Sequence, residues 1–313
     1  MGPWGITSAA ILARMAIRFD VFDDFHLHGA SAPEWAQRYV QLSPGLMRSA
    51  LIETASPGLH VFRKWMSERV VQQGCLPAGQ ICFAMLHGSG AGQPWMQGHP
   101  LHEALIFVLR AGQEFMLQRP PGMALLACSF DAETFRRLLD ARPWSAPANA
   151  LLSRSSVQAP PAELEALRRV LLQASSAPSV FAALTDLFEA AAGPVQRAGS
   201  ASAAYIVAAC HRLVAAGGDA PPDIDALCRR LRTSRRSLQN GFRQVADTTP
   251  VHYLRSLRLN AVRQRLLATA SQDLSVSQAA GDAGFEHLGH FGSRYRDLFG
   301  ELPSQTLRKT SLP

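Results

Sequence analysis

The feature that most constrains this chain is a pair of apolar stripes at helical spacing, separated by a short polar break, at residues 224–245. The stripes consist of Ile224, Leu227 and Leu231, followed by Leu238, Phe242 and Val245. Apolar residues three and four apart lie on one face of a helix. Ser234, in the break, suits a helix N-cap because its hydroxyl can accept an unpaired backbone N–H. The pattern predicts two short helices joined by a tight turn, the helix-turn-helix layout.

The second of these helices carries polar side chains on its outer face if the apolar stripe is buried. Arg236, Gln239, Asn240 and Arg243 lie three, four or seven residues apart and therefore share that face. Arg, Gln and Asn bind guanine and adenine edges in the major groove of DNA. We expect base contacts from Arg236, Gln239 and Asn240, and phosphate contacts from Arg235 and Arg243. A solvated polar face is the alternative when this unit is considered alone.

A second unit of the same kind follows at residues 275–299. The string Ala283-Gly284-Phe285 predicts its turn, and a helix over residues 287–299 follows. The apolar side chains expected on the buried side of that helix are Phe291, Tyr295, Leu298 and Phe299. Its candidate DNA contacts are His290 and Ser293 for bases, and Arg294 and Arg296 for phosphates.

A helical rod joins the two units. Thr249 is a candidate N-cap, and Pro250 suits the first position of a helix. The pattern continues to residue 267, which gives a helix of about 27 Å. Successive major grooves lie about 34 Å apart on one face of B-DNA. The sequence therefore predicts a domain whose two outer helices enter successive grooves of double-stranded DNA.

Several short strings in this region identify it further. They are Leu257-Arg258-Leu259, Ala261, Ala283-Gly284-Phe285, His290-Phe291, Tyr295-Arg296, Phe299-Gly300 and Pro303-Ser304. Together they resemble the DNA-binding domain of the AraC/XylS family of bacterial transcription regulators. The resemblance implies base contacts from the first unit's Arg236, Gln239 and Asn240. It also implies backbone contacts from the flanking arginines, RNA polymerase as a partner, and a role as an activator.

The second unit departs from the usual family pattern at its outer face. Leu288, Gly289, Gly292 and Ser293 stand where larger polar residues are common. We therefore expect the first unit to supply most of the direct base contacts, with the second mainly positioning the domain on phosphates. For His290, packing or orienting the helix is the alternative to a base contact.

The distribution of charge along the chain agrees with a DNA-binding role for its C-terminal part. The formal net charge of the 313-residue chain is +7. From Tyr205 onward the chain has 15 Lys and Arg against 9 Asp and Glu, whereas the first 204 residues have 16 against 15. A basic region beside a nearly neutral one indicates that only the C-terminal part contacts a polyanion.

The cysteines and the hydropathy indicate a cytoplasmic protein without a structural disulfide or zinc site. The five cysteines are scattered and contain no Cys-x-x-Cys pair. No run of eighteen apolar residues predicts a membrane span. The start of the chain lacks the features of a signal peptide, and we expect residues 1–18 to be a disordered tail or to reflect a wrongly assigned start, with Met15 as the true start.

The N-terminal half has a different pattern. Short apolar runs separated by Gly- and Pro-rich turns occupy residues 19–130 and predict a β-sandwich or barrel. A helix is expected at residues 35–42, and Asp131 is a candidate N-cap for a helix to residue 139. Amphipathic helices follow to residue 192, and they either form a dimer interface or cover their own domain.

The chain is therefore expected to have four parts. They are the N-terminal segment 1–18, a sensor and dimerisation domain at 19–192 (β-rich over 19–130 and helical over 131–192), a linker at 193–203, and the DNA-binding domain at 204–313. The fold class is a two-domain α+β protein, with an N-terminal β-barrel or sandwich plus helices and a C-terminal all-α double helix-turn-helix.

The sensor half loosely resembles the subset of the family that includes the ethanolamine-operon regulator. The strings that carry this are Trp35-Ala36-Gln37-Arg38-Tyr39, Leu42-Ser43-Pro44-Gly45 and Leu76-Pro77-Ala78-Gly79. The resemblance implies a cupin-like barrel followed by helices. Barrel mouths bind small ligands through aromatic and a few polar side chains. The candidates for effector contact are Trp65, Trp95, Gln97, Glu114 and Phe115.

Two alternatives to an effector-responsive regulator stay open. One is a constitutive regulator, or one gated by a partner protein. The other is a cupin-type metalloenzyme with a DNA-binding module, for which the candidate ligands are His26, His28, Glu34, His99, His102 and Glu103. Pro33 and the lack of strand-like alternation near Glu34 count against a metal site. We expect no enzyme activity, no cofactor and no metal.

Overall fold

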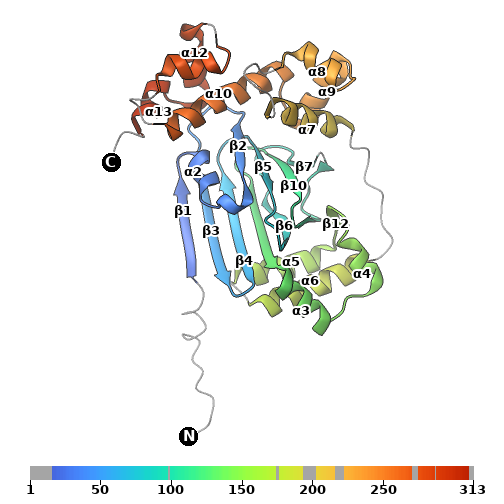
Figure 1. The fold of residues 1–313 in the computed structure, drawn as a ribbon. Coiled ribbons are helices and arrows are strands. Elements are labelled where there is room, and N and C mark those ends of the chain that lie inside the picture. Colours follow the sequence, from blue (N-terminus) through green and yellow to red (C-terminus); the bar gives the residue numbers. More distant parts are fainter. Residues whose placement is uncertain are drawn as a thin grey trace.

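The computed structural model describes residues 16–97, 99–173, 176–192, 202–215, 222–269, 274–285 and 287–309. It has four layers, formed by two β-sheets stacked face to face with a group of helices on the outer side of each (Figure 1). The expected fold class, a β-sandwich with helices followed by a helical C-terminal region, is confirmed. Residues 1–15 of the expected tail and 193–201 of the expected linker lie outside the described residues. Residues 16–18 belong to strand β1 (Ala16–Phe22), and residues 202–203 belong to helix α7 (Ser202–Ala215).

The two sheets are antiparallel throughout their described pairings. The larger sheet has the strand order β1 (Ala16–Phe22), β3 (Ser49–Ser56), β4 (Leu59–Met66), β11 (Ala124–Asp131), β6 (Gln80–Gly88), β9 (Leu105–Arg110) and β12 (Ser156–Gln158). The smaller sheet has the order β2 (Arg38–Gln41), β5 (Val70–Cys75), β10 (Glu114–Arg119), β7 (Trp95–Met96) and β8 (His99–Pro100).

Four helices cover the outer face of the larger sheet. They are α3 (Ala132–Ala141), α4 (Ala146–Leu151), α5 (Pro161–Leu172) and α6 (Ala177–Ala191). Phe83 and Phe130 of the sheet pack there against Phe135 and Phe188 of the helices. The predicted N-cap is confirmed, because the Asp131 side chain accepts a 2.7 Å hydrogen bond from the backbone N–H of Thr134. These amphipathic helices thus cover their own domain.

The helix expected at residues 35–42 was wrong. This segment follows α2 (Phe25–Ala30) and consists of one 3-10 turn, η1 (Pro33–Trp35), and the strand β2. Ala36 adopts a left-handed conformation with φ 45°, which ends the turn. Tyr39 and Val40 then pair with β5, where their shapes suit a pleated surface better than a helix. Pairing with a distant strand overrides the local helical pattern.

The C-terminal helices are α7 (Ser202–Ala215), α8 (Ile224–Arg230), α9 (Arg235–Ala246), α10 (Pro250–Ala268), α11 (Val276–Asp282), α12 (Leu288–Phe299) and α13 (Pro303–Lys309). The helices predicted at 234–245, 250–267 and 287–299 correspond to α9, α10 and α12 within one residue at each end. No helix in the described part of the chain is long and apolar enough to cross a membrane.

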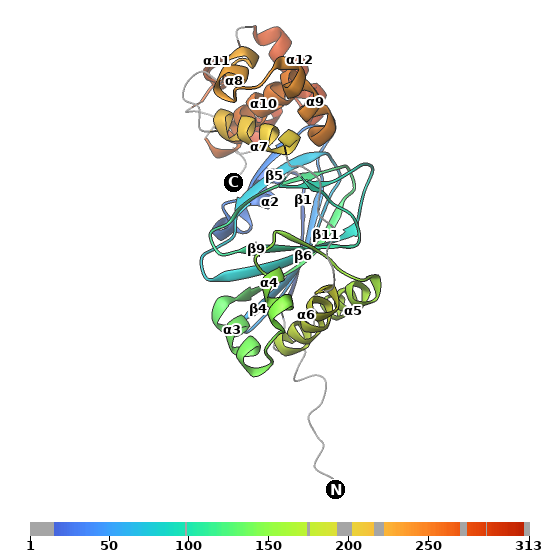
Figure 2. The same cartoon turned by 90° about the vertical axis from the view of Figure 1, so that its right-hand side faces the viewer.

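The outer face of the smaller sheet packs against the C-terminal helices, opposite α3–α6 (Figure 2). Val40 and Val71 of the sheet share an apolar cluster with Val207 of α7 and Leu254 of α10. A second shared cluster joins Phe25 and other residues of the β-sandwich domain to α10 and α12. Both helix-turn-helix units therefore pack against the β-sandwich domain.

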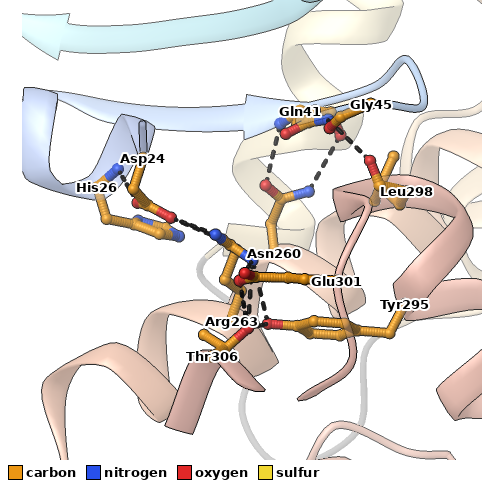
Figure 3. Close-up of polar contacts among 10 residues, drawn as sticks. All are labelled: Asp24, His26, Gln41, Gly45, Asn260, Arg263, Tyr295, Leu298, Glu301 and Thr306. Carbon is orange, nitrogen blue, oxygen red and sulfur yellow. Dashed lines mark hydrogen bonds and ion pairs between the residues drawn. The ribbon is translucent and has the colours of Figure 1, made fainter. Parts of the chain in front are cut away.

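Buried polar contacts reinforce this interface (Figure 3). Gln41 of β2 exchanges backbone hydrogen bonds with the Asn260 side chain, 3.0 and 3.1 Å long, and its own side chain donates to the Leu298 carbonyl at 2.8 Å. The Arg263 guanidinium contacts Asp24 of the β-sandwich domain at 2.7 Å and Glu301 at 2.8 Å. Arg263 is 4% exposed, so this ion network is shielded from water.

Candidate nucleic-acid interface

The first helix-turn-helix unit consists of α8 and α9. Leu227 of α8 packs with Leu238 and Phe242 of α9, and all three are fully buried. The predicted cap is present, because the Ser234 hydroxyl accepts a 3.0 Å hydrogen bond from the backbone N–H of Ser237. Packing and capping together fix which side of α9 is turned outward.

The outward side of α9 carries the residues proposed to contact DNA. Arg236, Gln239, Asn240 and Arg243 are all exposed, and they lie on the side opposite Leu238. Their exposure leaves the hydrogen-bonding groups that bases and phosphates need accessible from solvent. The structure therefore brings this predicted set together on one helix face.

Arg235 has a different environment from the other four. Its guanidinium donates two hydrogen bonds, of 2.8 and 2.5 Å, to the Asp225 carboxylate of α8. This hydrogen bonding raises the pKa of Arg235 and lowers that of Asp225. A phosphate contact from Arg235 therefore has to compete with Asp225 or share the guanidinium with it.

The second unit consists of α11 and α12. Gly284 has φ +79° in the turn, a conformation that glycine adopts without the strain a side chain would add. Phe291, Tyr295, Leu298 and Phe299 are buried, as predicted. The outward side carries His290, Ser293, Arg294 and Arg296, all exposed, with the two arginines on opposite flanks of the helix.

A cleft of about 480 Å³ lies between the two units, over α10. Arg255 and Arg258 of α10 and Arg294 of α12 line it, together with His287 and His290. Asp223, the N-cap of α8, is an acidic residue at its edge. Partial burial and the neighbouring Arg294 guanidinium lower the pKa of Arg255. The cleft is thus lined with positive charge, and a bound anion would stabilise the charged form of these arginines.

Arg255 and Arg258 were not predicted from the sequence as DNA contacts. Both lie on α10, which was predicted only as the helix that joins the two helix-turn-helix units. Residues 251, 254, 255 and 258 line the cleft and recur three or four apart along α10. That spacing is the signal that would have placed these arginines on one helix face.

The five candidates for effector contact are dispersed over the β-sandwich domain. Gln97 and Glu114 lie together, since the Gln97 side chain donates to the Glu114 carbonyl at 2.6 Å. Phe115 is buried between the sheets, where it packs against Trp35. Trp95 packs against the C-terminal helices, and Trp65 is 37% exposed on the larger sheet. One shared pocket for all five is not present in this arrangement.

The six possible metal ligands also fall on different elements. His26 and His28 are on α2, Glu34 is on η1, His99 is on β8, and His102 and Glu103 follow β8. The His28 imidazole hydrogen bonds to the Ser49 hydroxyl at 2.7 Å. Across the described ranges, no group of three His, Cys, Asp or Glu side chains is placed to hold a metal ion.

Comparison with known proteins supports the reading of the C-terminal region. A family model described as "Helix-turn-helix domain" matches residues 227–309. The XylDLEGF operon transcriptional activator of Pseudomonas putida is 42% identical over 86 residues, which are 28% of this chain and 27% of the activator. The HTH-type transcriptional regulator CdhR of Pseudomonas aeruginosa is 40% identical over 79 residues, which are 25% of this chain and 23% of the regulator.

A solved structure also matches about a third of the chain. It is a transcriptional regulator from Chromobacterium violaceum, described as an AraC-type DNA-binding domain-containing protein. The match has 30% sequence identity and a TM-score of 0.33, and it covers 36% of this chain and 99% of that one. This chain spans about a quarter of the length of the curated relatives named above.

Residues 227–309 thus form a helix-turn-helix domain, the class of DNA-binding domain that the two capped helix pairs define. In sequence this domain is similar to those of the transcriptional regulators named above, as the strings at residues 257–304 led us to expect. Both curated relatives are transcriptional regulators by name.

Proposed function

We propose that this chain is a sequence-specific transcriptional regulator that binds two successive major grooves with α9 and α12. The observation that carries the proposal is the exposed face of α9, where Arg236, Gln239 and Asn240 stand together beside Arg243. Arg suits guanine, and Asn or Gln suits adenine, through paired hydrogen bonds. On α12, Arg294 and Arg296 contact phosphates and fix the domain on the duplex, with His290 and Ser293 as its base contacts.

The cleft between the units extends this interface. Arg255 and Arg258 face the duplex between the two grooves and contact its phosphates there, together with Arg294. These contacts carry no sequence information by themselves, but they add affinity and fix orientation. Specificity is then concentrated in α9, while α10 and α12 supply affinity that depends on salt.

The remaining partners follow from the family. We propose that the protein activates transcription in the cytoplasm by contacting RNA polymerase, that it forms a homodimer through the sensor domain, and that the sensor binds a small effector. The strings at residues 35–45 and 76–79 support placing the sensor with the ethanolamine-operon regulator subset. Effector binding shifts the populations of conformations in which the sensor holds the DNA-binding domain.

Two variants test the assignment of DNA contacts. The first step is to select the preferred DNA sequence from a random pool with the full chain. Arg236→Ala should then lose discrimination at one base position, with an effect of about 1–3 kcal/mol on the preferred site and little effect on random DNA. Arg294→Ala should weaken binding to both DNAs and reduce the salt dependence.

A third variant supplies the control. Arg136 is exposed on α3, in the helical layer on the opposite side of the sandwich from α9. Arg136→Ala removes the same charge and should leave both affinities unchanged. If Arg236→Ala weakens binding equally on preferred and random DNA, Arg236 does not contact a base.

A further inference from the structure

The interior of the sandwich holds two positively charged side chains. Lys64 extends from β4 of the larger sheet, and Arg119 extends from β10 of the smaller sheet. Lys64 is 5% exposed and Arg119 is completely buried. They are neighbours, since the Arg119 guanidinium donates a 3.1 Å hydrogen bond to the Lys64 carbonyl. Two charges are thus held together in a region from which water is largely excluded.

No carboxylate pairs with either charge within the described part of the chain. The carboxylates that act on Lys64 electrostatically are Glu53 and Glu34. Glu53 contacts His60 at 3.2 Å and Arg18 at 3.9 Å instead, and Glu34 is exposed. Burial and the nearby Arg119 charge lower the pKa of Lys64 to about 8. Buried charges in proteins are ordinarily paired, so this arrangement lacks its anion.

The hydrogen bonds around these charges show where an anion would sit. The side-chain carbonyl oxygen of Gln37 accepts from Lys64 Nζ at 3.0 Å, from Gln72 Nε2 at 3.0 Å and from the Tyr39 hydroxyl. Three donors therefore converge on one neutral oxygen, which has only two lone pairs. The Arg119 guanidinium donates to the side-chain carbonyl oxygen of Gln72, and Arg119 Nε has no hydrogen-bond partner in the described part of the chain. The cluster has more donors than acceptors.

A carboxylate matches this excess of donors better than an amide does. It has two oxygens with about four acceptor sites, and its charge strengthens each hydrogen bond. The Trp35 and Phe62 rings form an apolar wall beside the cluster, 5.5 Å apart, with Lys64 Nζ 5.3 Å from the Phe62 ring centre. Gln37 is half-buried, and it follows the left-handed Ala36 on the short segment before β2.

We propose that Lys64, Arg119, Tyr39 and Gln72 form a binding site for the carboxylate group of a small organic acid. In this structure the Gln37 amide occupies the position proposed for the carboxylate, where the donors of Lys64, Gln72 and Tyr39 converge. The Gln37 side chain turns outward when the acid binds. Tyr39 and Gln41 lie on the same strand, and Gln41 holds Asn260 of α10, so the site is connected to the DNA-binding domain. A role in regulation rests on the proposed function, whereas binding of the acid does not.

The donor excess can be tested before any ligand is known. Gln37→Glu replaces the amide with a carboxylate of nearly identical shape at the proposed carboxylate position. It should raise the Tm of the full chain at pH 7 by about 2–4 °C, because it supplies the missing charge. Gln158→Glu, on the exposed side of β12, adds the same charge elsewhere and should not change the Tm.

A second variant identifies the cause of the gain. With Lys64→Met in the background, Gln37→Glu should lose most of its stabilising effect, since the principal cation is gone. Equal gains with and without Lys64, or a Tm that falls or stays constant in Gln37→Glu alone, would show that the charges need no anion and would overturn the proposal.

Binding itself is tested with sodium acetate as the probe. Gln37→Ala removes the side chain that occupies the proposed carboxylate position. Acetate should therefore raise the Tm of this variant more than equal concentrations of sodium chloride or acetamide do. Acetamide has the same shape without the charge. Equal shifts with acetate and acetamide would overturn the proposal. Because no DNA is present, this result is independent of whether α9 and α12 bind DNA.

Discussion

At the scale of the residue, Arg263 shows how its surroundings decide the role of an arginine. Arg263 and Arg265 are two residues apart on the same basic helix, and nothing in the sequence separates them. Arg263 is buried between Asp24 and Glu301, whereas Arg265 pairs with Asp282 at the surface. Asp24 and Arg263 are 239 positions apart, so no local pattern contains this contact.

The difference between these two arginines gives the first prediction. Arg263→Met leaves two carboxylates buried without a cation, and it should lower the free energy of unfolding by about 3–5 kcal/mol. Arg265→Met removes an exposed ion pair from the same helix and should cost about 0–1 kcal/mol. Urea denaturation of the full chain measures both. Similar losses for the two variants would contradict the buried network.

Two buried histidines predict how stability depends on pH. Burial and the charges of Lys64 and Arg119 lower the pKa of His28 to about 2, and burial beside Arg38 and Arg212 lowers that of His211 to about 4. In the unfolded chain both lie near about 6.5. Below that pH the unfolded chain binds more protons than the folded chain, so stability falls as the pH falls.

The expected slope is about 1.4 kcal/mol per pH unit for each of these two imidazoles, and His26, whose pKa is lowered to about 4 mainly by burial, adds a third contribution. Urea denaturation at pH 7, 6 and 5 measures it, and His211→Gln should reduce the slope by about one proton. A free energy of unfolding that is constant between pH 6 and pH 5 would mean that these imidazoles are accessible to protons in the folded protein.

At the scale of the element, the sequence was most informative where each helix has its own cap and turn. Ser234 and Thr249 were predicted as caps, and their side chains accept hydrogen bonds from the first turns of α9 and α10. The helix predicted at residues 35–42 was wrong because the partner strand of this segment, β5, lies about thirty residues further along the chain. Local chemistry fixes a helix end, whereas a short edge strand depends on a distant neighbour.

The cleft lined by α10 and α12 gives a prediction at the same scale. Arg255→Ala and Arg258→Ala should each lower the slope of log K against log salt by about 0.9, the value for one lost phosphate contact. The bases preferred in a selection experiment should not change. Arg265→Ala, on the same helix but paired with Asp282, is the matched control and should leave the slope unchanged. Unchanged slopes in all three variants would remove the cleft from the interface.

At the scale of the whole molecule, the β-sandwich domain and the helix-turn-helix units share two apolar clusters and a buried polar network. We therefore expect them to unfold together in one calorimetric transition. Gln41→Ala combined with Asn260→Ala removes the hydrogen bonds between β2 and α10 and should separate the transition into two. Two transitions in the unaltered protein would show that the interface does not couple the domains.

We propose that α9 and α12 bind successive major grooves unequally, with α9 supplying most of the sequence specificity. Selection of preferred sites from random DNA, followed by hydroxyl-radical footprinting on the selected site, tests this most directly. If α9 and α12 enter successive grooves, two segments on one face of the duplex should be protected, about 10–10.5 base pairs apart. The strongly selected bases should lie in the segment whose preference Arg236→Ala relaxes. A single protected segment, or equally strong preferences that Arg236→Ala leaves intact, would contradict it.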